Sequence, residues 1–221
     1  MNTQQAFPES SGDRSVVVAA AELVDAVTEA VVDCLGRSAV VRRLSDGSLP
    51  FAGRVAWLEQ HWEGLRILRD CVVVPAGLRA ELAASTGRLN LALDRAHASA
   101  RWRDRHVTMP SMLTFRRHVA GLREDGDLLG LAAQAYVRLL AAGVGSGLTV
   151  TGTVPRPAAG LHRDLCSMVS GQEDLELLSE ELSAGLLMVM QHGSDVCRAY
   201  RDAMTDESCA VTVATIRDAL R

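Results

Sequence analysis

Apolar residues return every three or four positions along most of the chain. In residues 16–35 valines, alanines and leucines form one such stripe, and acidic residues lie at helical intervals between them. A stripe with this period is typical of amphipathic helices that bury one face. The pattern predicts an all-α fold, a single-domain bundle of about seven to eight helices.

The same period places further helices along the chain. We expect them over residues 39–44, 51–71, 78–101, 112–122, 127–142, 161–169 and 173–204, with a last helix from Thr205 or Asp206 to Arg221. Turn-forming residues such as Gly36 and Pro50 separate them. Neither an internal repeat nor a domain-length linker interrupts the pattern, so we expect one domain over residues 14–221.

Three stretches lack a helical pattern. Residues 1–13 are polar and contain a proline, serines and a glycine, which predicts a disordered arm. Residues 101–105 are charged, and we expect them to be exposed. Residues 149–160, TVTGTVPRPAAG, form the longest such stretch. Two interpretations remain open for it, a flexible connection or a lid over a cavity.

The helix over residues 128–142 is followed by a cluster of glycines, Gly143, Gly145 and Gly147. Each glycine within a helix costs about 1 kcal/mol relative to alanine, so such a cluster needs a reason. Either the helix ends here with residues that adopt the left-handed conformation, or the bare backbone lets a flat group approach.

The residues around this helix also carry a family pattern. Residues 128–147 read LLGLAAQAYVRLLAAGVGSG, and they follow a segment with Met109 and Pro110 and an acidic turn at 124–127. This arrangement resembles the biliverdin-producing heme oxygenases, whose distal helix reads LL-x-AHAY-x-RYLGDLSGGQ. Residues 37–68 resemble a second block of that family. The resemblance covers about half of the chain and implies a heme oxygenase-like fold.

The resemblance implies a cofactor and its chemistry as well. Heme would lie between the first helix and the glycine-terminated helix, and it would be cleaved oxidatively to biliverdin. An electron-donor protein would be a partner, since nothing in the sequence indicates a flavin or nicotinamide site. The residues that the resemblance places at the cofactor are Val32, Tyr136, Arg138, Ala142, Gly143, Gly145 and Gly147.

Two positions depart from the family pattern. Val32 occupies the place of the histidine that ligates the heme iron, and a valine cannot bind iron. Ala142 occupies the place of the distal aspartate. One hypothesis is that the chain retains a heme or tetrapyrrole pocket with a compensating ligand. The other is a repurposed scaffold, a pseudoenzyme candidate that binds another small molecule or assists an enzyme of small-molecule metabolism. Whether the chain is an active oxidoreductase stays open.

Tyr136 and Arg138 match family residues near the cavity and the heme carboxylates. An arginine fork binds a carboxylate through two hydrogen bonds, so Arg138 is a candidate anchor for an acidic ligand. The alternative is that Tyr136 packs in the core while Arg138 pairs with a glutamate of a neighbouring helix.

The histidines do not have the spacing of a metal site. His61 lies between two glutamates in EQHWEG, and non-heme di-iron oxidases share the heme oxygenase-like fold. The His-x-x-x-Asp-x-x-His pattern of their late helix is incomplete at His192, so we expect no metal and a structural or surface role for His61. We expect His97 and His106 to be solvated. His162 is the remaining candidate for a ligand contact.

The composition of the chain excludes several classes of binding partner. The net charge is −4 and the chain has no lysine, so it has no strongly basic surface for nucleic acid. Its five cysteines are widely spaced, which favours reduced thiols over a zinc site or disulfides. Without a signal sequence or a long apolar run, we expect a cytoplasmic protein with no membrane segment and a small-molecule ligand.

Overall fold

The structure is a computed structural model, which describes residues 11–71, 75–144 and 159–201. These residues form eight α-helices and one short 3-10 helix and contain no strand. The elements are α1 (Ser11–Arg37), α2 (Ala39–Ser45), α3 (Phe51–Cys71), α4 (Ala76–Ala96), η1 (Ala100–Asp104), α5 (Pro110–Glu124), α6 (Leu128–Val144), α7 (Ala159–Cys166) and α8 (Gln172–Ala199). The predicted all-α class and the predicted number of helices are confirmed.

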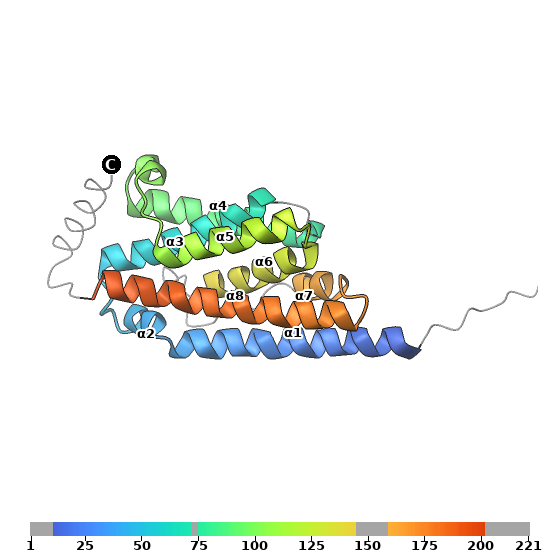
Figure 1. The fold of residues 1–221 in the computed structure, drawn as a ribbon. Helices are drawn as coiled ribbons and strands as arrows, with labels where there is room; N and C mark the ends of the chain where they lie inside the picture. Colours follow the sequence, from blue (N-terminus) through green and yellow to red (C-terminus); the bar gives the residue numbers. More distant parts are fainter. Residues whose placement is uncertain (1–10, 72–74, 145–158, 202–221) are drawn as a thin grey trace, which may run out of the picture.

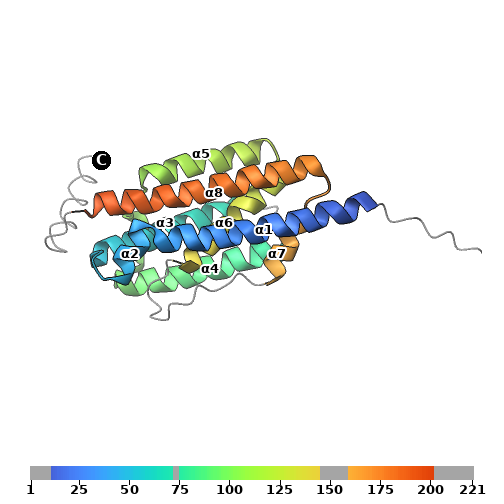
Figure 2. The same ribbon diagram turned by 90° about the horizontal axis from the view of Figure 1, so that it is seen from below.

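Helix α6 occupies the centre of the bundle. It packs against α1, α3, α4, α5, α7 and α8, and every residue from 129 to 141 is buried. A helix that is apolar on all sides is stable only when other helices enclose it. In Figure 1, α1 and α8 lie along one side of α6, and α3, α4 and α5 lie along the other. The view from below in Figure 2 shows α1 crossing in front of α6 with α8 beside it.

Several helices begin or end a few residues from their predicted bounds. Helix α1 begins at Ser11, inside the expected arm. Helix α5 begins at Pro110, because the fixed φ of proline suits the first helical position. Asp127 caps α6, since its Oδ1 accepts the Gly130 N–H at 2.7 Å.

The loop between α4 and α5, residues 97–109, is more ordered than its charge indicated. Residues 100–104 form η1, and Trp102 within it is only 3% exposed. The Trp102 ring packs edge-on against Trp62 of α3, with 4.7 Å between ring centroids. Its indole N–H donates to Asp94 Oδ1 at 2.8 Å. The expectation of an exposed segment is therefore wrong at Trp102.

Other predictions fall outside the described residues. These are most of the disordered arm, most of the 149–160 stretch with its two interpretations, Gly145, Gly147, and the last helix up to Arg221. Within the described part of the chain, no helix combines the length and the apolar character that crossing a membrane requires.

Candidate functional site

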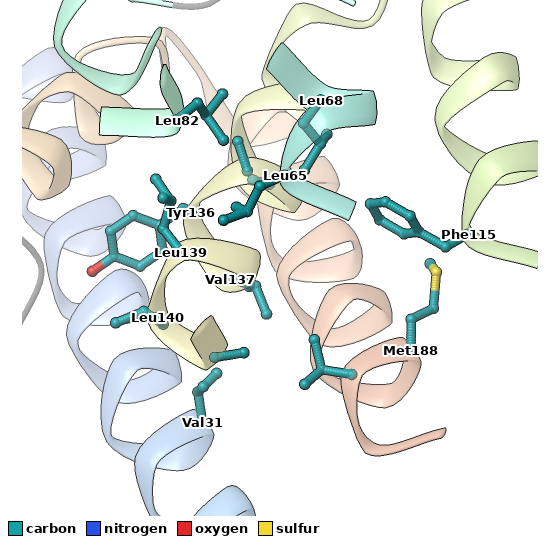
Figure 3. Close-up of a cluster of buried hydrophobic side chains, with 14 of the residues drawn as sticks. Val31, Leu65, Leu68, Leu82, Phe115, Tyr136, Val137, Leu139, Leu140 and Met188 are labelled. Carbon is teal, nitrogen blue, oxygen red and sulfur yellow. The ribbon is translucent and has the colours of Figure 1, made fainter. Parts of the chain in front are cut away.

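Helices α1 and α6 meet where the resemblance places the cofactor. Val31 and Leu140 lie at this interface (Figure 3), and both are buried. The Tyr136 hydroxyl lies 2.8 Å from Thr28 Oγ1, which donates its hydrogen to the Val24 carbonyl oxygen at 2.7 Å. Tyr136 must therefore be the donor to Thr28. Burial raises the pKa of Tyr136, which keeps the hydroxyl protonated for this bond. A polar bridge thus joins α1 directly to α6.

The side of α1 that is buried in the bundle has no group that ligates iron. Its fully buried positions include Val24, Val31 and Leu35, and Val32 beside them is half-buried. Helix α1 contains no histidine, and its one cysteine, Cys34, is a free, half-buried thiol. The described residues of this interface therefore do not fit a heme whose iron needs an axial ligand from α1.

The other predicted site residues on α6 have different surroundings. Tyr136 points toward α1, whereas Arg138, two residues later, lies on another face of the helix and contacts α3 and α5. Figure 3 shows Tyr136 and Phe115, the α5 ring next to Arg138, on opposite sides of α6. Ala142 and Gly143 are half-buried in the last turn of α6. The structure therefore does not bring Tyr136 and Arg138 into one site.

Arg138 is a buried cation. Its side chain is 1% exposed, and its guanidinium carbon lies 4.1 Å from the Phe115 ring centroid. A Cβ at Gly64 would lie 3.3 Å from Arg138 Cδ, so this glycine makes room for the arginine. Burial lowers the pKa of Arg138 to about 9, opposed by the charge of Glu63. The guanidinium is therefore still charged at neutral pH.

Glu63 lies near Arg138, but other groups hold its oxygens. The carboxylate forms an ion pair with Arg116 and accepts hydrogen bonds from His106 Nε2 and Thr108 Oγ1, each at 3.1 Å. Burial alone would raise the pKa of Glu63, yet the His106 hydrogen bond and the Arg116 charge outweigh it and lower the pKa. The side chain of His106 is only 11% exposed, so the expectation that it is solvated is wrong.

Both ring nitrogens of His106 face acceptors. Nδ1 lies 3.0 Å from the Arg103 carbonyl oxygen, and Nε2 faces the Glu63 carboxylate. A ring that donates from both nitrogens is an imidazolium. Burial lowers the pKa of His106, but the bonds to Glu63 and to the Arg103 carbonyl outweigh it and raise the pKa.

Glu59 and Gln60, from the same turn of α3, hold the loop before α5 as well. Glu59 Oε1 lies 2.8 Å from His97 Nε2. The Gln60 amide donates to the Val107 carbonyl oxygen at 2.9 Å and accepts the Met109 N–H at 3.0 Å. His97 is exposed, as expected, but its side chain is paired with Glu59. Glu59, Gln60 and Glu63 thus fix a segment that lies about 40 residues later in the chain.

A pocket of about 380 Å³ lies between the start of α3 and this loop, with Tyr200 at its edge. The Glu59–His97 pair lines it, as do two exposed arginines, Arg101 and Arg105. Its apolar walls include Phe51, Val55, Ala56, Trp102, Val107 and Met109. An apolar hollow with a few converging polar groups is the usual form of a small-molecule site. Sequence reasoning missed it, because its walls come from segments far apart in the chain.

Comparisons with protein-family models and with curated proteins find no match to this chain. Among the described residues, no group of three or more histidine, cysteine, aspartate and glutamate side chains is arranged to hold a metal ion.

Proposed function

We propose that this chain is a repurposed heme oxygenase-like scaffold that binds a small non-heme molecule in the pocket between α3 and the 97–109 loop. The observation that carries the proposal is the α1–α6 interface. Its fully buried α1 side chains are apolar, and Tyr136 bonds Thr28 across it. A heme enzyme needs an iron ligand and an electron donor, whereas a binding protein of this kind needs neither.

The pocket favours a ligand with an apolar body and an acidic group. Arg101 and Arg105 line it, are exposed, and form no ion pair with a described residue. Arg103, between them, is instead paired with Asp94 at 2.8 Å. Guanidinium groups bind carboxylates and similar anions through paired hydrogen bonds. The described cysteines are free, which fits a reducing compartment, so we propose a cytoplasmic location.

Titration with hemin tests the first half of the proposal. We expect the Soret band of hemin to stay that of the unbound form when protein is added in excess. A shifted band that saturates at one hemin per chain would contradict the proposal and favour a heme pocket with a compensating ligand.

An anionic apolar dye, 8-anilinonaphthalene-1-sulfonate, tests the pocket. Each charge-assisted hydrogen bond contributes about 1.5–3 kcal/mol, so the double variant Arg101→Gln/Arg105→Gln should bind the dye at least tenfold more weakly. The matched control is Arg79→Gln/Arg95→Gln, which removes two exposed arginines of α4. Equal loss of dye fluorescence in both variants would show that the dye responds only to net charge.

A larger side chain inside the pocket gives an independent test of where the dye binds. Val107 lines the pocket and is 37% exposed, whereas Leu91 is 61% exposed and lies outside it. Val107→Trp should abolish saturable dye binding, and Leu91→Trp should leave it unchanged. Unchanged binding in Val107→Trp would place the dye elsewhere on the molecule.

A further inference from the structure

Three buried side chains from three helices present nitrogen atoms that lack a hydrogen-bond partner in the structure. These are both ring nitrogens of His61 in α3, both terminal nitrogens of Arg138 in α6, and Nε2 of His192 in α8. Each of the three residues is 1% exposed. In native proteins buried polar atoms are almost always paired, so five unpaired atoms in one region indicate that something else occupies it.

The three side chains lie close enough together to interact electrostatically. Apart from burial, the charge of Arg138 lowers the pKa of both His61 and His192, and His61 contributes to the lowering at His192. The pKa of His61 falls to about 3, so its ring is neutral at pH 7. The cluster therefore contains one permanent cation and two neutral imidazoles.

The charges around the cluster do not balance. Arg138 is positive, and the acid near it, Glu63, is already held by Arg116, His106 and Thr108. The amide of Gln60, next to His61 in α3, bonds Val107 and Met109. The Phe115 ring offsets only part of the cost of burying a guanidinium. A water molecule would satisfy hydrogen bonds here but would leave the positive charge uncompensated.

The donors and acceptors of the cluster specify the occupant. Arg138 offers the N–H groups of its two terminal nitrogens, and neutral His61 offers one donor and one acceptor. His192 Nδ1 donates to the Met188 carbonyl oxygen at 2.7 Å, so its free Nε2 is an acceptor. A cation is excluded by the arginine charge. An anion that also carries a hydroxyl can accept from Arg138 and His61 and donate to His192.

We propose that a monovalent oxyanion with the hydrogen-bonding groups of bicarbonate binds between His61, Arg138 and His192 inside the bundle. The site is separate from the pocket beside the 97–109 loop and does not depend on the function proposed for that pocket. It supplies the missing counter-charge and partners for four of the five unpaired nitrogens, all except the acceptor nitrogen of His61. Chloride, with the same charge and no hydroxyl, serves as the comparison anion.

Thermal unfolding of the full chain at constant pH and ionic strength, in a gluconate background, tests the proposal. A ligand that binds only the folded state stabilises it with concentration, so bicarbonate should raise the Tm in a saturable way, by about 5–10 °C at a hundredfold excess over its Kd. Chloride should raise it less. The Arg138→Met variant should lose the bicarbonate response, and Arg117→Met, which removes an exposed arginine of α5, should retain it.

Three results would overturn the proposal. The first is an equal bicarbonate response in Arg138→Met and wild type, which would mark a general salt effect. The other two would come from wild-type crystals grown with bicarbonate and, separately, with bromide. Electron density for ordered waters only, with no planar anion between the three side chains, would show that the cluster is merely hydrated. An anomalous bromide peak there, with no response to bicarbonate, would assign the site to halides. The crystals keep the test decisive even if Arg138→Met does not fold.

Discussion

At the scale of single residues, neighbours on α6 have unlike roles because of the helical period. Tyr136 and Arg138 are two positions apart, so one bonds Thr28 of α1 while the other lies over Phe115 of α5. The sequence identified both as site candidates, but it could not specify their partners. Those partners lie 108 residues away for Tyr136 and on a separate helix for Arg138.

The bridge between α1 and α6 gives a prediction for Tyr136. Tyr136→Phe removes the donor to Thr28 without changing the packing of the ring, and it should cost about 1 kcal/mol of unfolding free energy. Urea unfolding of Tyr136→Phe, Thr28→Val and the double variant measures the coupling between them. A coupling energy near zero would mean that the hydrogen bond contributes nothing to the contact of the two helices.

At the scale of elements, the helices were largely predictable and the loop before α5 was not. The period of apolar residues depends on local spacing, so it predicted α6 as a helix, although the structure buries every position from 129 to 141 and not one face alone. The 97–109 loop is instead ordered by Glu59, Gln60 and Glu63, which are between 38 and 49 residues away in sequence. No pattern within the loop reveals such partners, so its histidines were assigned to solvent.

Helix packing also gives different surroundings to two glycines that both lie within a helix. A Cβ at Gly193 of α8 would lie 2.6 Å from Val40 Cγ1 of α2, whereas a Cβ at Gly87 of α4 meets nothing within 4 Å. Val40 is 1% exposed and has little room to move. Gly193 therefore lies where α2 and α8 are in close contact, whereas Gly87 has room for a side chain.

The two glycines should respond to alanine in opposite directions. Gly193→Ala should destabilise the protein by about 1–2 kcal/mol, since overpacking outweighs the gain in helix propensity. Gly87→Ala, the matched control, should stabilise it by about 0.5–1 kcal/mol. Midpoints of chemical denaturation measure both. Equal effects of the two substitutions would contradict the close contact between α2 and α8.

At the scale of the whole molecule, α3 connects two buried polar groups with opposite responses to pH. Glu63 binds the imidazolium of His106, whose pKa is raised by that bond. His61 belongs to the cluster with His192 and Arg138, where burial and the arginine charge lower the pKa of both histidines. One group favours the protonated ring, and the other excludes the proton.

These shifts predict a maximum of stability near neutral pH. His61 and His192 stay unprotonated in the folded chain. Below the unfolded pKa of 6.5 the unfolded chain therefore binds more protons than the folded chain, and the stability decreases as the pH decreases. Each contributes about 1.4 kcal/mol per pH unit to this acid slope. The contribution of His106 is complete below pH 6.5 and is lost as pH rises through its raised pKa. Glu63, with its lowered pKa, loses its contribution only below about pH 4.5.

Urea unfolding between pH 5 and pH 8.5, in gluconate buffer, separates the two effects. His61→Phe should reduce the acid slope by about half and leave the alkaline side as in the wild type, because one of two proton-excluding rings is gone. His106→Gln should reduce the loss of unfolding free energy on the alkaline side and leave the acid slope unchanged. If His61→Phe keeps the full acid slope, the folded chain already protonates His61, and the neutral state assigned to that ring is wrong.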